Sequence, residues 1–247
     1  MNEIYPWMLL SILLGGAGFL IAFSKAIKER KNVLDSLPSE TTESILEGKE
    51  TLRDVLSRYA MVYSMLAVPA FMYTILVSML VYIFGVQSDA QVRVAMGALI
   101  AVGLSSFFAN LGRTFIFREA MSGLNEREKG SKNDFGKYMI FLTIFETLAI
   151  FGLLISVQGL TLAGLTGLEV DLGMHAADMY FYGAVILGLS TSCSILMVWL
   201  FNKVEGPLNE DNQLFMKKLY YLFAGHLPAL IGLIVAIYLM IEGGMVG

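Results

Sequence analysis

The chain has 247 residues, of which 56% are hydrophobic and 15% charged, and its mean hydropathy is +0.67. A soluble domain of this size could carry that composition only with a very apolar surface, so the soluble class is excluded. The net charge of −4 and the single cysteine give no sign of a nucleic-acid-binding surface and exclude an intrachain disulfide framework.

Six apolar segments are long enough to cross a membrane, whose hydrocarbon core of about 30 Å needs roughly 20 helical residues. They are Trp7–Ile27, Tyr59–Gly85, Val92–Phe117, Lys137–Leu160, Met179–Phe201 and Leu219–Ile241. The first has no basic region before it and no small-residue cleavage site, so we expect a retained helix and not a signal peptide. The sequence predicts an all-α integral membrane protein with six transmembrane helices.

Basic residues predict the orientation of these helices. Of the 17 Lys and Arg residues, all but Arg93 lie in or beside the loops after the first, third and fifth segments, with Arg113 counted among the loop residues. Short loops rich in Lys and Arg stay on the cytoplasmic side. We therefore expect a multi-pass protein of a prokaryotic plasma membrane, with both termini outside and the three hairpin loops in the cytoplasm.

The six segments group into three helical hairpins that form an internal repeat. We expect hairpin 1 at residues 1–90, with a long cytoplasmic loop at 28–57, hairpin 2 at 91–175 and hairpin 3 at 176–247. The match is clearest between the last two hairpins. Val102-Gly103-Leu104-Ser105 recurs as Leu187-Gly188-Leu189-Ser190, and Ala149-Ile150-Phe151-Gly152-Leu153 recurs 80 residues later as Ala229-Leu230-Ile231-Gly232-Leu233.

Small residues gather in the odd-numbered helices, whereas the even-numbered ones carry bulky Leu, Ile, Phe, Met and Tyr. Small residues let helix backbones approach closely in lipid. This predicts two layers, with odd helices inside and even helices outside. The stretch Ser39–Arg58 has helical apolar spacing, which fits an amphipathic extension of the second helix; a solvated charged loop fits equally well.

Glu146 is the one carboxylate deep within a predicted span, nine residues from Lys137 and fourteen from Leu160. A charge at such a depth costs at least ~2.5 kcal/mol, so we expect this carboxyl to be protonated, ion-bound or paired, and we treat it as a functional site. The alternative is a neutral Glu that hydrogen-bonds a neighbouring helix and serves packing only.

Candidate partners at the same depth are polar and uncharged: Asn110 and Ser106 on the preceding helix, and Thr143 and Thr147 on the same helix. We therefore expect no internal salt bridge, and chemistry limited to a bound proton or a cation held by oxygen atoms. In the repeat, Glu146 corresponds to His226 in hairpin 3 and to the region Ala67-Val68-Pro69 in hairpin 1. A lone His in an apolar helix is more often a neutral, hydrogen-bonded group.

Around this carboxyl the residues resemble a known family. Phe135-Gly136-Lys137 followed by Ile144-Phe145-Glu146-Thr147-Leu148, with the small Gly97–Gly112 helix before it, is similar to the proteolipid subunits, called c or K, of V-type and A-type rotary ATPases. The resemblance covers about 60 residues of hairpin 2 and weakens in the other two. Six helices, in place of two or four, and the long first loop depart from the family.

The resemblance implies a non-catalytic rotor subunit in which Glu146 carries the transported ion, with no cofactor beyond bound H⁺ or Na⁺. Implied partners are copies of the chain or other ring subunits, a stator membrane subunit, central-stalk subunits at the cytoplasmic loops, and lipids. Sodium-binding relatives place a Thr-Gln pair near the site, where this chain has Pro69, Tyr73 and Thr74, so protons are favoured over sodium.

Two alternatives to the rotor subunit stay open. One is a structural or assembly membrane protein related to the proteolipids. The other, a transporter working alone, would need more polar midplane groups than the chain has. The outer-loop residues Glu169, Asp171, His175 and Asp178 lack the constrained spacing of a metal site and fit a solvated acidic loop better.

Overall fold

The computed structural model describes residues 3–36, 45–46, 50–125, 140–165, 172–205 and 212–245. Its long helices are α1 (Tyr5–Ser36), α3 (Leu52–Phe84), α4 (Asp89–Asn125), α6 (Glu146–Leu162), α7 (Met174–Glu205) and α8 (Asn212–Glu242). Two-residue strands, β1 (Ile45–Leu46) and β2 (Glu50–Thr51), pair antiparallel just before α3. Within the described residues six helices are long and apolar enough to span a membrane, which confirms the all-α, six-helix prediction.

The first hairpin differs from expectation near its loop. Helix α1 continues to Ser36 and α3 begins at Leu52, so both helices extend into the segment 28–57 that was expected to be loop. The amphipathic helix considered for Ser39–Arg58 is wrong for Ile45 and Leu46, because these residues pair with β2 as a strand. The remaining residues before β2 lie outside the described part of the chain.

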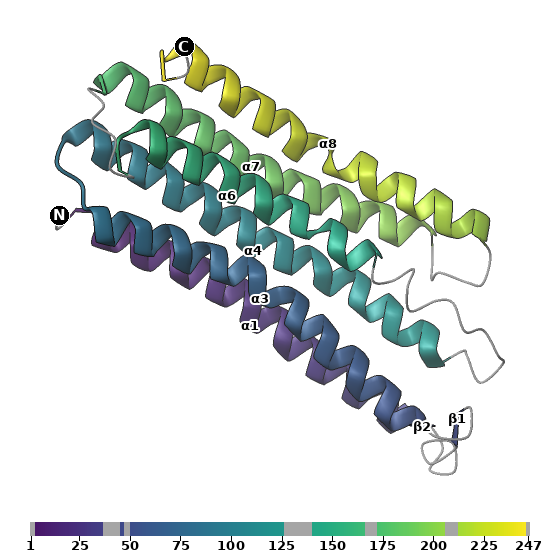
Figure 1. The fold of residues 1–247 in the computed structure, drawn as a ribbon. Coiled ribbons are helices and arrows are strands. Elements are labelled where there is room, and N and C mark those ends of the chain that lie inside the picture. The colour runs from purple at the N-terminus through teal and green to yellow at the C-terminus, as the bar shows by residue number, and fades with distance from the viewer. Residues whose placement is uncertain are drawn as a thin grey trace.

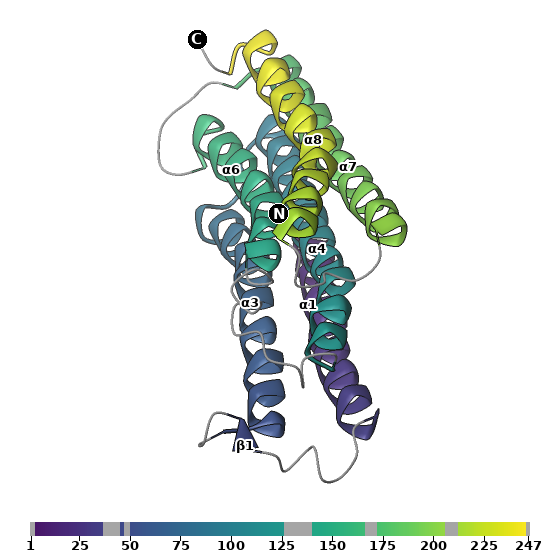
Figure 2. The same ribbon diagram turned by 90° about the vertical axis from the view of Figure 1, so that its right-hand side faces the viewer.

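The helices form two layers (Figures 1 and 2). Helices α1, α4 and α7 form one row, in which α4 packs against both neighbours, and each row member packs against its own returning helix, α3, α6 or α8. Contacts among the three returning helices are much fewer. The predicted division into an odd-numbered and an even-numbered layer is confirmed. Both termini lie at one end of the bundle (Figure 1).

Glycines explain how closely the row packs. A Cβ atom on Gly18 of α1 would lie 2.9 Å from the Phe107 Cα of α4. One on Gly103 of α4 would lie 3.1 Å from the Ser11 Cα of α1. Such distances leave room for hydrogen but for no side chain, so small residues set the helix spacing here as predicted for packing in lipid.

The internal repeat is visible in equivalent contacts of hairpins 2 and 3. A Cβ atom on Gly152 would lie 2.6 Å from the Ser105 Cβ, and one on Gly232 would lie 2.5 Å from the Ser190 Cβ. Since these pairs are separated by the sequence offsets noted above, each returning helix meets its own row helix in the same register. The sequence repeat is therefore also a repeat of packing.

The returning helices also end alike. Helices α3, α6 and α8 are followed by Gly85, Gly164 and Gly244, with φ angles of 67°, 75° and 76°, a conformation that favours glycine. After Gly164 and Gly244 the next amide donates to the carbonyl four residues before the glycine, at 2.9 and 3.0 Å, in the Schellman pattern. These caps align all three hairpins.

Large apolar side chains cover the outward faces of the returning helices. On α3 they include Met61, Met65, Met72, Leu76 and Tyr82, and on α8 Tyr220, Phe223, Leu227, Ile231 and Ile234, all of them exposed. Water would not tolerate so continuous an apolar surface, whereas lipid matches it. The protein is a multi-pass membrane protein.

Candidate functional site

The site lies between α4 and α6, whose register is fixed by direct contacts. The Ser156 hydroxyl of α6 donates to the Ala98 carbonyl of α4 at 2.7 Å, and Gly152 lets Ser105 approach. Counting back along the antiparallel pair places Asn110 beside Glu146, the depth that the sequence predicts. The same packing brings Arg113, one helical turn from Asn110, to the carboxylate.

Glu146 begins α6 directly after an irregularity in the helix. The span starts at Ile140, but the helix is interrupted by a turn at Phe145. The Leu148 amide donates to the Phe145 carbonyl at 3.2 Å, a tighter i to i+3 contact than an α-helix makes. The Phe145 ring fits against Gly112 of α4, where any side chain would collide with it.

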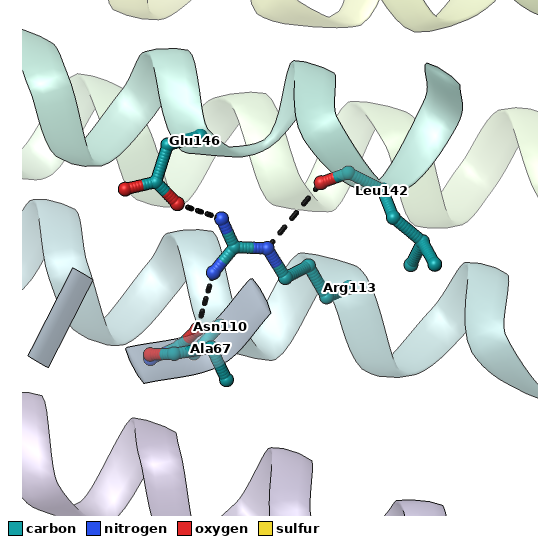
Figure 3. Close-up of polar contacts among 5 residues, drawn as sticks. All are labelled: Ala67, Asn110, Arg113, Leu142 and Glu146. Carbon is teal, nitrogen blue, oxygen red and sulfur yellow. Dashed lines mark hydrogen bonds and ion pairs between the residues drawn. The ribbon is translucent and has the colours of Figure 1, made fainter. Parts of the chain in front are cut away.

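Arg113 forms an ion pair with Glu146 (Figure 3). Its Nη2 donates to Glu146 Oε2, its Nη1 donates to Asn110 Oδ1 at 2.6 Å, and its Nε donates to the Leu142 carbonyl at 3.3 Å. The Arg113 side chain is 0% exposed and that of Glu146 is 16% exposed. The expectation that no internal salt bridge neutralises Glu146 is wrong, because Arg113 was assigned to the loop although it lies inside its span.

Asn110 links this pair to the first hairpin. Its side-chain oxygen accepts from Arg113, and its Nδ2 donates to the Ala67 carbonyl of α3 at 3.2 Å. The Tyr73 side chain of α3 is close enough to interact electrostatically with both Glu146 and Arg113. The charged pair therefore lies at the junction of α3, α4 and α6, with hydrogen bonds that orient the guanidinium.

The other predicted site residues are not brought to the carboxylate. Ser106 is fully buried one turn from Asn110, and its hydroxyl has no hydrogen-bond partner among the described residues. Thr143 is exposed and Thr147 is half-buried. Of the predicted set, the structure joins Asn110 to Glu146, through Arg113.

Sequence reasoning missed Arg113 and gave Tyr73 no role in the site. A signal for Arg113 existed: it lies three residues after Asn110, one turn along the same helix face, and an arginine side chain spans that distance. Counting every basic residue near a span end as a loop residue concealed it. Nothing in local sequence indicated that Tyr73, on another hairpin, would meet Glu146.

Electrostatically, the pair makes two buried charges compatible with a membrane. Either charge alone would be costly in lipid, and together they are neutral and hydrogen-bonded. Glu146 Oε1 is buried without a hydrogen-bond partner among the described residues. One carboxylate oxygen is thus held by the guanidinium, and the other can accept a proton.

The capping glycines locate the equivalents of Glu146 in the other hairpins. Glu146 lies 18 residues before its glycine (164 − 146), and the same count gives Ala67 in α3 (85 − 67) and His226 in α8 (244 − 226). The His226 Nδ1 lies 2.7 Å from the Leu222 carbonyl, and its ring packs 5.5 Å from that of Phe145. A hydrogen-bonded His226 agrees with the interpretation favoured from sequence.

At the outer ends of the helices, Arg93 donates to Asp178 at 2.8 Å and lies over the Phe181 ring. Asp178 therefore pairs with α4, and His175 lies on the same helix, α7. Glu169 and Asp171 fall outside the described residues, so the acidic outer loop is not further characterised.

The fold and the site together define the class: a membrane protein of helical hairpins with a carboxylate inside one of them, as in the proteolipids. Comparison with protein families identifies the segment more closely. The family model of the ATP synthase C-subunit matches residues 96–158, which span most of the apolar part of α4 and nearly all of α6, including Arg113 and Glu146. This confirms the resemblance over hairpin 2. No curated protein and no solved structure matches the chain.

Proposed function

We propose that the protein is a rotor subunit of the membrane ring of a V-type or A-type ATPase or ATP synthase, with Glu146 as its ion-exchange group. The observation that carries this proposal is a membrane-embedded carboxylate inside the segment that matches the C-subunit family of ATP synthases, a family of non-catalytic ion-translocating proteins. Hydrolysis or synthesis of ATP would take place on other subunits of the complex.

The ion is a proton. Glu146 Oε1 has no hydrogen-bond partner among the described residues, so it is the atom that accepts the proton, while Oε2 faces Arg113. A protonated carboxyl is neutral and crosses lipid more cheaply than a carboxylate. Ion exchange therefore requires the Arg113–Glu146 pair to open as the proton is taken up.

The partners follow from this assignment. Copies of the chain or other ring subunits complete the ring, a membrane stator subunit meets the Glu146 level, and central-stalk subunits meet the hairpin loops. The distribution of Lys and Arg supports cytoplasmic loops and outer termini, in a prokaryotic plasma membrane. Lipid surrounds the exposed apolar faces of α3 and α8.

The test is ATP-driven proton transport in membranes that carry the complete complex. Glu146→Gln should abolish proton transport and leave the complex assembled, because an amide keeps the shape of the side chain and cannot exchange a proton. His226→Gln, at the equivalent level of hairpin 3, is the matched control and should retain transport. Full activity of the Glu146→Gln complex contradicts the proposal.

A second function is favoured by the three hydrogen bonds that fix the fully buried Arg113. In this alternative the ion pair is permanent, and the chain is a structural or assembly protein related to the proteolipids. The oligomeric state in mild detergent separates the two: a rotor subunit elutes as a closed ring of many copies, whereas the assembly protein elutes alone or as one copy beside a ring.

A further inference from the structure

The guanidinium of Arg113 fills a site built from oxygen atoms. Its three acceptors are a carboxylate oxygen of Glu146, an amide oxygen of Asn110 and a backbone carbonyl oxygen of Leu142. Carboxylate, amide and carbonyl oxygens are also the ligands that hard metal cations take in proteins. The cluster is thus a cation site that is occupied by part of the chain itself.

The direction of the Arg113 side chain is unusual for its position. Arg113 lies two residues before the end of the apolar part of α4, which closes at Phe115. Arginines near helix ends normally extend their side chains to the membrane interface. Here the side chain is 0% exposed and turns towards Glu146. An interfacial position is within its reach, so the guanidinium has two places to lie.

We propose that Arg113 acts as a tethered cation, which takes the place of the transported ion at Glu146 and excludes Na⁺ from it. This rests on the proposed function of Glu146 as an ion-exchange group. A sodium ion in the same oxygen cluster would lie against a permanent positive charge, and the repulsion prevents binding. With the pair closed, hairpin 2 is neutral without any bound ion.

The proposal separates protons from sodium. A proton binds covalently to Oε1 of Glu146 and needs no coordination sphere, whereas Na⁺ needs several oxygens at once, including those that Arg113 holds. Sodium can therefore enter only where the guanidinium is absent. Arg113 would be the residue that makes this site specific for protons.

The experiment is binding of radioactive Na⁺ to the purified full-length chain in detergent. Wild-type protein should bind no Na⁺ at this site, and Arg113→Gln should gain about one Na⁺ per chain, since it uncovers one carboxylate with its oxygen neighbours. Arg113→Lys should bind none, because it keeps the charge. Arg93→Gln, which removes an ion-paired arginine on the same helix, is the matched control and should also bind none.

A double variant, Arg113→Gln with Glu146→Gln, should lose the gained Na⁺ and so assign it to this carboxylate. Saturable binding by wild-type protein that Glu146→Gln removes overturns the proposal without any Arg113 variant. So does a folded Arg113→Gln or Arg113→Met chain that binds no Na⁺, with folding checked by elution volume and helix content. Binding requires no rotation, so failure of the rotor function appears separately, as transport that survives Glu146→Gln.

Discussion

Hairpins 2 and 3 have the same backbone packing and opposite chemistry at the same level. In hairpin 2, α4 presents Asn110 and Arg113 to Glu146 of α6. The repeat places Ile195 and Val198 of α7 at the positions of Asn110 and Arg113, and both are buried and apolar. His226 of α8 takes the position of Glu146.

This difference shows that the fold does not require the charges. Hairpin 3 keeps the glycine contact and the terminal cap, with apolar residues on α7 where hairpin 2 has Asn110 and Arg113. Buried ion pairs can often be replaced by apolar residues without loss of stability, and hairpin 3 is a natural instance of that replacement. The pair in hairpin 2 is therefore better explained by function than by folding.

The largest effect is expected when one partner of the pair is removed. Arg113→Val or Glu146→His alone should lower the free energy of unfolding by about 3–5 kcal/mol, because a buried charge is left unpaired. The triple variant Asn110→Ile, Arg113→Val and Glu146→His, which copies hairpin 3, should recover most of that loss.

Thermal or denaturant unfolding in detergent measures these variants as a thermodynamic cycle. Strong coupling between the Arg113 and Glu146 substitutions supports the comparison of the two hairpins. Additive losses, with the triple variant less stable than either single one, would mean that hairpin 2 depends on its charges for folding.

Next in size is the glycine contact that the two hairpins share. Gly152→Ala and Gly232→Ala each place a Cβ atom within 2.6 Å of a serine Cβ, so each should cost about 1–3 kcal/mol through overpacking. Similar losses in both, measured by the same unfolding assay, confirm equal packing. A loss confined to Gly152→Ala would show that hairpin 3 is the looser copy.

Most of the fold could be predicted from the sequence because its signals are local. Apolar length predicts the spans, and the positions of Gly103 and Gly188 reveal both the repeat and the row in which they pack. Glu146 was also predictable, since a lone carboxylate among apolar residues is conspicuous. The Arg113 contact was not predicted because charge patterning treats an arginine near a helix end as cytoplasmic, and its direction depends on the Glu146 carboxylate of another helix.

A smaller effect is expected at Ser156. Its hydroxyl donates to the Ala98 carbonyl across the α4–α6 interface and to Gly152 within α6. The repeat gives Ala236 at this position, packed against Gly183. Ser156→Ala copies that arrangement and should cost about 0.5–1.5 kcal/mol, the net contribution of a hydrogen bond. Ala236→Ser is the reciprocal control and should not stabilise the protein, because Gly183 leaves its backbone closely approached.

The smallest effect is expected at the other ion-paired arginine of α4. Arg93 and Asp178 have side chains 33% and 38% exposed, near the outer ends of their helices, so solvent screens the attraction between them. Arg93→Gln should lower the free energy of unfolding by about 0.2–1 kcal/mol, including loss of the contact with the Phe181 ring. The loss should shrink further at high salt, whereas the effect of Arg113→Val should not, because Arg113 is inaccessible to ions. Equal salt dependence at the two arginines would place Arg113 in contact with solvent and contradict its role as a buried counter-ion.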